Sequence, residues 1–449
     1  MYNRGRLYGI CLVVSLGGIL FGFDLVVISG TIPFFRQYFQ LTEAGVGWAV
    51  GCVNLGAALG ALAAGRLSDR FGRKKLLLCC AALFALTGPG TGWAGQFEWF
   101  IIFRLLSGIA VGIASLACPV YIAEISPTVF RGRMVSFYQL AIVSGLLLAY
   151  LADYLLLDTG RDNWRWMFTS QAVPALLFFT GLFFVTESPR WLAGRGRLKP
   201  ALKVLESIGG PFYAEEQLTK IQDSFKALSE PVRKRDWMMV FRKKEYRKVA
   251  LLGVCIAVFS QADGQNSLFS YAPEIFRQAG MGRDSAIFQS MFLGVVNFFF
   301  TFIAIGSIDR YGRRKLLLTG SLLLSLDAVL LALTFASGAP SFLVLAEVLV
   351  FIAIYAATLG PVTWVTLSEL FPNKVRGSLM SVATLSLWIA NFITTASFPV
   401  MRTLWGLPLT FGLHALICLV YFFFVRSKVP ETKGRSLEEI ETMIAIPSH

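Results

Sequence analysis

Charged residues are scarce in this chain of 449 residues, and their scarcity excludes most soluble folds. Asp, Glu, Lys and Arg make up 15% of the sequence, whereas a soluble globular domain carries about 25%. Hydrophobic residues make up 55%, aromatic residues make up 14%, and the mean hydropathy is +0.64. This composition predicts an all-α membrane protein.

The sequence also lacks the motifs of enzymes and of ATP-driven pumps. Its seven cysteines all lie in apolar stretches, with no CxxC pair and no loop pair that could form a disulfide. Two histidines, His414 and His449, are too few for a metal site. No nucleophile elbow, Walker loop or dinucleotide fingerprint is present. We therefore expect no metal, no cofactor and no enzymatic activity, and we expect gradients to supply the energy.

Twelve apolar stretches are each long enough to span a bilayer, which takes about 20 residues. They are 7–35, 45–65, 76–93, 99–122, 134–157 and 167–185, followed by 249–275, 287–308, 316–336, 342–367, 379–401 and 407–425. We predict six-helix bundles at 1–186 and 249–426, a cytoplasmic linker at 187–248 with short helices at 200–208 and 214–228, and a tail at 427–449.

Three charged motifs occur once in each half of the chain. The copies are Asp69, Arg70 and Arg73 with Asp309, Arg310 and Arg313 (240 residues apart), Glu124 and Arg131 with Glu369 and Arg376 (245 residues apart), and Glu187 with Glu431 (244 residues apart). Such nearly constant spacing indicates a tandem duplication. In a chain this apolar, internal duplication is typical of transporters.

Lys and Arg residues are concentrated in alternate loops. When the spans are threaded through a membrane, 34 of the 41 lie on the same side as the N-terminus. Cytoplasmic loops carry this excess, so we predict a multi-pass protein of the plasma (inner) membrane with both termini in the cytoplasm. The net charge of +14 then reflects topology and contact with anionic lipid, and we expect no nucleic-acid partner.

Two spans contain residues that interrupt a helix. The stretch 260–267 holds seven polar or glycine residues in eight positions, and Gly360-Pro361 interrupts the tenth span. Unwound backbone is tolerated at membrane depth only where it lines a cavity or is buried in protein. We therefore predict that these two spans face the substrate.

Several motifs together resemble the sugar porter family of the major facilitator superfamily, and especially bacterial sugar-proton symporters and animal glucose facilitators. The motifs are GGILFGFD at 17–24, the duplicated Asp-Arg-x-Gly-Arg loops, Arg104 with Gly108, PVYIAE at 119–124, ESPRWL at 187–192 and PETKG at 430–434. The resemblance implies two six-helix bundles around a central site for a sugar or polyol, opened to each side in turn. We expect a monomer.

Asp24 in the first span and Arg104 in the fourth are predicted to pair and to couple transport to protons. An ionised group at mid-membrane costs about 2.5 to 3.5 kcal/mol even on the insertion scale, so each needs a partner. The resemblance implies that Asp24 takes up the proton and that Arg104 adjusts the pKa of this carboxyl. Facilitators, by contrast, carry a neutral residue at the acid position. The alternative is a static ion pair that only orders the bundle.

Amide and aromatic side chains within the spans are candidates for the sugar site. Amides both donate and accept hydrogen bonds, and rings pack against a sugar face. The resemblance assigns this role to Phe21, Gln139, Gln261, Asn266, Asn297, Gly360, Trp364, Trp388 and Asn391, and we add Gln265. The alternative for Asn297, Asn391 and Trp388 is a bond or packing contact with a neighbouring helix.

Three positions depart from the family pattern in the second half. Ser260 replaces the first of two glutamines, Ser270 replaces the first of two tyrosines, and Leu387 stands where bacterial relatives have a polar residue. These changes predict a wider pocket with fewer hydroxyl partners, with added polarity from Asp263 and Gln265. The substrate could be a hexose, a pentose, inositol or a modified sugar.

Three further acids lie within apolar spans and have no family role: Asp153, Asp327 and Glu347. Asp327 or Glu347 could be a second proton site. The alternative is burial of each acid against a polar neighbour.

The twelve charged residues of the duplicated motifs are predicted to form networks at the cytoplasmic ends of both halves. Because these ends touch in only one of the two states of such a transporter, the networks would latch one state and release the other. The alternative is a role in topology and solubility alone.

Together these observations predict a proton-coupled symporter for a monosaccharide or polyol, working by alternating access. A uniporter with the same pocket is the first alternative, and it predicts that Asp24→Asn leaves net uptake intact. A membrane sugar sensor is the second, but a sensor would need a long signalling tail, whereas 426–449 is short.

Overall fold

The computed structural model describes residues 2–227, 244–372 and 375–434, and within these ranges it contains helices and no strands. The first half holds α1 (Arg4–Phe39), α2 (Glu43–Phe71), α3 (Arg73–Gly92), α4 (Phe97–Ile125), α5 (Arg131–Leu155), α6 (Asn163–Ser170) and α7 (Ala172–Phe183). The second half holds α12 (Lys244–Ala262), α13 (Gln265–Gln278), α14 (Arg283–Tyr311), α15 (Arg313–Ser337), α16 (Ser341–Ala357), α17 (Leu359–Leu370) and α18 (Arg376–Lys428). The prediction of an all-α fold is confirmed.

The spans follow the twelve predicted stretches. Within the described residues, 10 helices are long and apolar enough to cross a membrane. One of them, α18, is two spans joined at Gly406, which has a non-helical φ of 75°. A further span is divided between α12 and α13. The six-plus-six arrangement expected from the duplication is therefore present.

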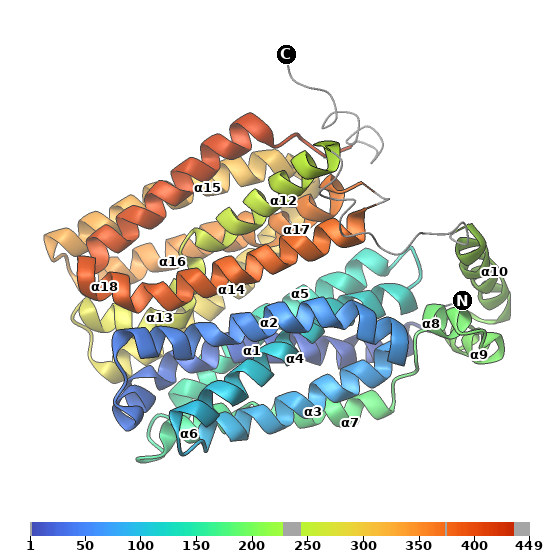
Figure 1. The fold of residues 1–449 in the computed structure, drawn as a ribbon, viewed down its shortest axis with the longest axis horizontal. Helices are drawn as coiled ribbons and strands as arrows, with labels where there is room; N and C mark the ends of the chain where they lie inside the picture. The colour runs from blue at the N-terminus through green and yellow to red at the C-terminus, as the bar shows by residue number, and fades with distance from the viewer. Residues whose placement is uncertain (1, 228–243, 373–374, 435–449) are drawn as a thin grey trace.

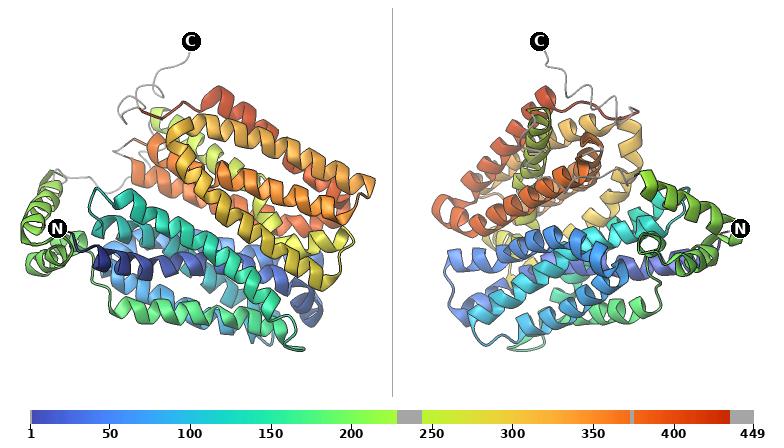
Figure 2. Two further views of the ribbon diagram at one scale, coloured as in Figure 1. Left: turned by 180° about the vertical axis from the view of Figure 1, so that it is seen from behind. Right: turned by 45° about the vertical axis from the view of Figure 1, so that its right-hand side comes forward.

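Three short helices connect the halves and mark one end of the molecule. They are α8 (Pro189–Gly194), α9 (Leu198–Gly209) and α10 (Pro211–Ala227), and the last two correspond to the helices predicted in the linker. They project from one end of the bundles, which we call the linker end (Figures 1 and 2). We call the opposite end the far end. The predicted tail beyond residue 434 and the linker stretch 228–243 lie outside the described residues.

The two halves pack against each other mainly through α2 with α18 and α5 with α14. In Figure 1, the first half, coloured blue to green, lies below the second, coloured yellow-green to red. Glycine allows the α2–α18 contact, because a Cβ atom at Gly47 would clash with the carbonyl oxygen of Ala396.

The seventh span is broken where the sequence predicts it. Helix α12 ends at Ala262 and α13 begins at Gln265, and between them Gly264 has a φ of 98°. Only glycine adopts such a positive φ without strain.

The break in the tenth span is displaced from the predicted site. It lies at Thr358, with φ −128° and ψ −85°, whereas Gly360 and Pro361 fall in the first turn of α17. The reason is local. Proline has no N–H for the carbonyl four residues earlier, at Ala357, and its ring crowds that carbonyl, so the helix breaks before the proline and not at it.

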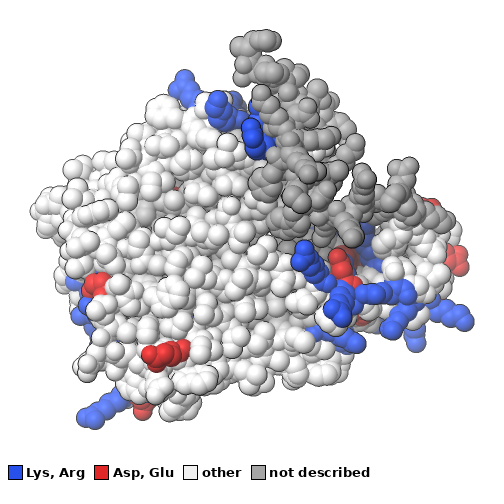
Figure 3. Space-filling model, viewed as in Figure 1, with Lys and Arg blue, Asp and Glu red and all other residues white. Residues whose placement is uncertain are grey.

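The surface agrees with a membrane location. On the face drawn in Figure 3, charged side chains gather at the linker end, and the surface between the two ends carries very few. Large hydrophobic side chains are exposed along the bundles, among them Leu86, Phe184, Phe299, Leu333 and Leu409. An apolar band of this kind is suited to lipid tails and unsuited to water.

Candidate functional site

Asp24 and Arg104 meet in the interior of the first half, between α1 and α4. The Arg104 Nη1 atom lies 3.4 Å from Asp24 Oδ1, and both side chains are 1% exposed. Ser107, one turn along α4, donates a 2.6 Å hydrogen bond to the same carboxylate oxygen. Asp24 Oδ2 and Arg104 Nε and Nη2 have no hydrogen-bond partner. The acid is therefore buried and paired, with one carboxylate oxygen that has no hydrogen-bond partner.

The broken seventh span gathers four of its polar side chains into one chain of hydrogen bonds. Asn266 Nδ2 donates to Gln261 Oε1 at 2.7 Å, and Gln265 Nε2 donates to Asn266 Oδ1 at 3.2 Å. Gln261 in turn donates to Ser260 Oγ at 3.4 Å. Gln265 Oε1 is buried without a partner, so this end of the chain can still accept a hydrogen bond.

Phe21 of α1 and Trp388 of α18 bring the two halves into aromatic contact. Their ring centroids are 5.9 Å apart and the planes are inclined at 50°. Trp388 is buried, and its Nε1 has no acceptor among the described residues. An indole N–H normally finds a partner when it is buried, so a free one at an interface is available to a ligand.

The remaining sugar-site candidates do not all join this cluster. Asn391 Oδ1 instead accepts a hydrogen bond from Asn54 Nδ2 of α2, at 3.4 Å, which favours the helix-contact alternative. Asn297 is buried and Gln139 half-buried, while Trp364 is 38% exposed. A Cβ atom at Gly360 would lie 3.1 Å from the ring of Tyr355. The glycine therefore allows the Tyr355 ring to pack closely against the backbone. Among the described contacts, the side chains of Gln139, Asn297 and Trp364 make no hydrogen bond.

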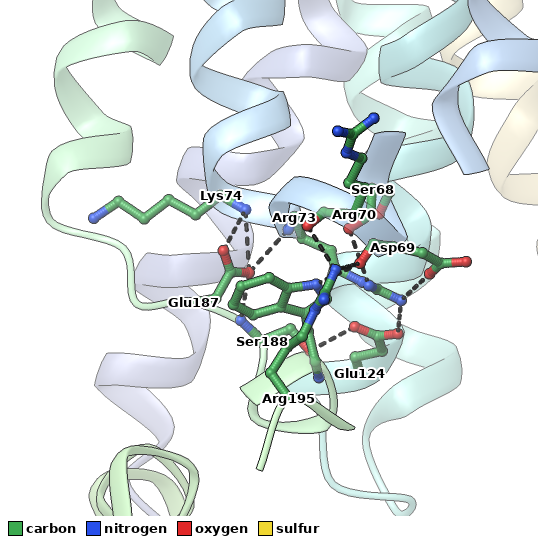
Figure 4. A network of polar contacts seen from close by, with 10 residues as sticks. Ser68, Asp69, Arg70, Arg73, Lys74, Glu124, Glu187, Ser188 and Arg195 are labelled. Atoms are coloured by element: carbon green, nitrogen blue, oxygen red, sulfur yellow. Dashed lines mark hydrogen bonds and ion pairs between the residues drawn. The ribbon is translucent and has the colours of Figure 1, made fainter. Parts of the chain in front are cut away.

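The linker end of the first half holds the predicted charge network (Figure 4). Arg73 Nη2 lies 2.9 Å from Glu124 Oε1 and 3.2 Å from Asp69 Oδ1. Glu187 accepts hydrogen bonds from the backbone N–H groups of Arg73, at 3.0 Å, and Lys74, at 3.2 Å. Ser188 Oγ donates to the second oxygen of Glu124. The α2–α3 corner is thus tied to α4 and to the start of α8.

The second half repeats this network. Arg313 Nη2 lies 2.9 Å from Glu369 Oε1, and Glu431 accepts from the backbone N–H groups of Arg313, at 3.0 Å, and Arg314, at 3.2 Å. Thr432 Oγ1 donates to the second oxygen of Glu369 at 2.6 Å. Thr432 thereby takes the position of Ser188, which lies 244 residues earlier, the same spacing that separates Glu187 from Glu431. The Asp309 side chain lies outside the described part of the chain.

Four of the predicted network residues contact other groups. Arg70 and Arg310 lie over the rings of Phe71 and Tyr311, with centroid distances of 5.1 and 5.4 Å. Arg131 and Arg376 donate from Nε to the carbonyl oxygens of Ala123 and Phe371, each at 3.1 Å. The described ion pairs of Arg73 and Arg313 each stay within one half.

At the far end, a second network joins the two halves, and the sequence analysis missed it. Arg402 of α18 is 7% exposed, and its guanidinium lies 3.2 Å from Glu43 of α2 and 2.9 Å from Glu274 of α13. Arg36 of α1 pairs with the same Glu43 at 2.6 Å. The structure is therefore closed at the far end by buried and half-buried ion pairs.

Two of the other three intramembrane acids accept a hydrogen bond from a polar neighbour. Asp153 is fully buried and accepts a 3.1 Å hydrogen bond from the backbone N–H of Gly30. Glu347 accepts from Thr334 Oγ1 at 2.8 Å. Asp327 is buried, and its Oδ2 has no hydrogen-bond partner.

Comparison with known proteins identifies the relatives of this chain. A family model described as "Sugar (and other) transporter" matches residues 10–444. The D-xylose-proton symporter of Escherichia coli is 35% identical over 98% of this chain and 96% of its own. The arabinose-proton symporter of Bacillus subtilis is 34% identical over 98% and 96%, and the galactose-proton symporter of E. coli is 36% identical over 98% and 94%.

Solved structures give the same result. The inward open conformation of the xylose transporter XylE from E. coli superposes with a TM-score of 0.87 at 34% identity, covering 97% of this chain and 99% of that one. Its partially occluded inward open conformation superposes with a TM-score of 0.85 at 33% identity, covering 96% of this chain and 99% of that one.

Proposed function

Because this chain belongs to the sugar porter family of the major facilitator superfamily, we propose that it carries a monosaccharide or polyol into the cell together with protons. The observation that carries the proposal is the buried Asp24–Arg104 pair, which has one free carboxylate oxygen. Relatives from two bacteria are named as symporters of protons with xylose, arabinose and galactose.

The proton acts through α1. Protonation of Asp24 removes the negative charge that holds Arg104, and the released guanidinium weakens the contact between α1 and α4. Phe21 lies one turn before Asp24 on the same helix face, where it touches Trp388 of the other half. A shift of α1 on protonation is thus passed directly to the aromatic contact between the halves.

The sugar binds between this aromatic contact and the broken seventh span. Trp388 Nε1 supplies a free donor and Gln265 Oε1 a free acceptor, both buried. Gln261 and Asn266 supply amides that a sugar hydroxyl can join or displace. Each hydroxyl of a sugar can both donate and accept a hydrogen bond, and these four side chains together provide donors and acceptors for it.

Alternating access follows from the different nature of the two ends. With both termini in the cytoplasm, the linker end faces inward, and the Arg402 network closes the outer side in this state. The duplicated networks hold the inner ends of 1–186 and 249–426 in shape, so that each half rocks as a unit. Arg402 then has to release Glu43, its partner in the first half, before the outer side opens.

Uptake into proteoliposomes tests the proposal. Labelled D-xylose, L-arabinose, D-galactose and myo-inositol are each offered with and without an inward proton gradient. We expect one of them to accumulate above equilibrium only with the gradient. We expect the Asp24→Asn variant to lose accumulation but to keep exchange of internal for external sugar.

The exposed acid Asp158 provides the control, because Asp158→Asn should accumulate sugar as the wild type does. Equilibration that ignores the gradient, with Asp24→Asn transporting normally, would establish a uniporter and leave Asp24 as a structural partner of Arg104.

A further inference from the structure

A second buried carboxyl lies at the break of the seventh span. The Asp263 side chain is 0% exposed, and its Oδ1 accepts a 3.0 Å hydrogen bond from the backbone N–H of Gln265. Its Oδ2 is buried without a hydrogen-bond partner. An isolated carboxylate in such a place is far more costly to bury than a neutral acid, so this oxygen requires a proton or a cation.

A titratable group of α18 packs directly on this break. The His414 imidazole is buried, and its Nδ1 lies 3.1 Å from the carbonyl oxygen of Ala262. A carbonyl only accepts, so Nδ1 carries the hydrogen. His414 Nε2 has no partner. A Cβ atom at Gly264 would lie 2.8 Å from His414 Cγ, which shows how closely the ring packs on the break.

The other titratable groups around Asp263 are neutral ones. Cys418 and Tyr421 of α18 and Tyr355 of α16 lie within electrostatic range, and Cys418 Sγ is 3.8 Å from the Asp263 carbonyl oxygen. The ion pairs described for this structure do not include Asp263. Asp24, by contrast, has both Arg104 and Ser107.

We propose that Asp263 is a second proton-binding residue, separate from Asp24, and that its proton is carried with the sugar. The inference rests on the proposed symport. Gln265 connects the two ligands, because its N–H holds the Asp263 carboxylate while its side chain leads to Asn266 and Gln261. A sugar that engages these amides therefore acts on the carboxyl. His414 is a positioning residue that holds the break.

The proton balance over one cycle is simple. A proton from the outer solution binds Asp263 Oδ2, travels as part of the neutral carboxyl, and leaves to the inner solution after the sugar. With Asp24 loaded in the same way, two protons accompany each sugar. No bond is made or broken apart from these O–H bonds.

The number of protons per sugar is measured at zero net flux. Proteoliposomes with the membrane potential clamped at zero receive a fixed inward proton gradient, and the outward gradient of the best sugar of the uptake panel is varied until net flux stops. At that point, the sugar gradient equals the proton gradient raised to the number of protons per sugar. We expect two for the wild type and one for Asp263→Asn, whose amide oxygen can still accept the Gln265 N–H.

Two further variants distinguish an effect of the Asp263 carboxyl from an effect of the His414 imidazole or of altered packing. Asp153→Asn removes an equally buried acid that is bound to the Gly30 N–H, and should leave the number at two. His414→Gln can still donate to the Ala262 carbonyl and should also leave it at two. A wild-type value of one that Asp263→Asn does not change would overturn the inference and leave the symport intact.

Other results have distinct meanings. A lowered number in His414→Gln alone would move the proton to the imidazole and contradict the assignment to Asp263. If a sodium gradient drove sugar accumulation in place of the proton gradient, and Asp263→Asn lost this sodium-driven accumulation, Asp263 would belong to a cation site instead. If neither the wild type nor any of these variants showed proton-coupled sugar flux, the proposed function itself would be refuted.

Discussion

Trp388 presents a buried N–H with no acceptor at the contact between the two halves. Trp388→Phe keeps a ring against Phe21 and removes only this donor. A neutral hydrogen bond contributes about 0.5 to 1.5 kcal/mol, so we expect the apparent KM for the transported sugar to rise about 2- to 10-fold with the maximal rate little changed. Initial uptake rates over a range of sugar concentrations measure both quantities.

The control for this variant is Trp405→Phe, because Trp405 is exposed at the far end and has no place in the proposed sugar site. An unchanged KM in Trp388→Phe would remove the indole N–H from the sugar site and leave the ring as packing between the halves.

At the residue scale, the sequence reveals groups whose burial is costly by itself. Asp24 and Arg104 stand alone in apolar stretches, so each indicates a need for a partner, and the structure pairs them. Ser107 and Asn54 carry no charge, and a polar side chain in a span can bond to any of several neighbouring helices, so the sequence does not identify their partners. Only the packing of helices brings Ser107 to Asp24 and Asn54 to Asn391.

The helix corners at Gly72 and Gly312 depend on two carboxylates from distant segments. The two glycines have φ values of 97° and 88°, and a Cβ atom at either would run into the carboxylate of Glu187 or Glu431. Gly72→Ala and Gly312→Ala should each lower the midpoint of thermal unfolding in detergent. The positive φ alone costs an L-residue about 1 to 2 kcal/mol.

Matched controls lie seven and six residues before these corners. Gly65 and Gly306 are helical, and a Cβ atom there would meet nothing within 4 Å. Alanine at either position should raise the midpoint slightly, because glycine in a helix costs about 0.5 to 1 kcal/mol. If all four variants behaved alike, the carboxylates would not be what fixes the corners.

Element boundaries could be predicted as far as local chemistry sets them. The break between α12 and α13 was predicted correctly, because it lies within the stretch 260–267, where polar residues and glycine weaken the helix. In the tenth span, proline marks a break that occurs before it, at Thr358. The constraint acts on the carbonyl of an earlier residue, so the side chain that causes a break and the residue that adopts it differ.

Closure of the far end depends on one guanidinium shared by both halves. Arg402 is buried between Glu43 and Glu274, and breaking such a pair by removing one partner costs about 3 to 5 kcal/mol. Arg402→Gln should therefore shift the molecule toward the state open at this end. A cysteine placed at Ser270, which is buried on α13 one turn before Glu274, should then react faster with a bulky impermeant maleimide.

Lys220→Gln, combined with the same cysteine, is the control, because the Lys220–Glu216 pair lies in the linker helix α10 and is exposed on both sides. Exposed pairs contribute about 0 to 1 kcal/mol, so labelling should hardly change. Equal labelling rates in the wild type and in Arg402→Gln would mean that helix packing, and not this network, keeps the far end closed.

For the molecule as a whole, the duplicated motifs predicted two similar halves, because each copy of a motif serves its own half. They could not predict which end is closed. Closure depends on Glu43, Glu274 and Arg402, which lie in separate stretches with no repeat or spacing in common. Contacts between halves differ from state to state, and a single sequence encodes all of the states.

The described contacts of the first linker-end network all lie within the first half and α8, and this has a consequence for how the protein is made. The partners that hold the first corner lie between Ser68 and Arg195, so this corner network can be completed before α12 has been synthesised. The far-end bridge requires Glu43, Glu274 and Arg402, which leave the ribosome at widely separated times. Biosynthesis can thus proceed as two successive insertions, with the joining of the halves as its last step.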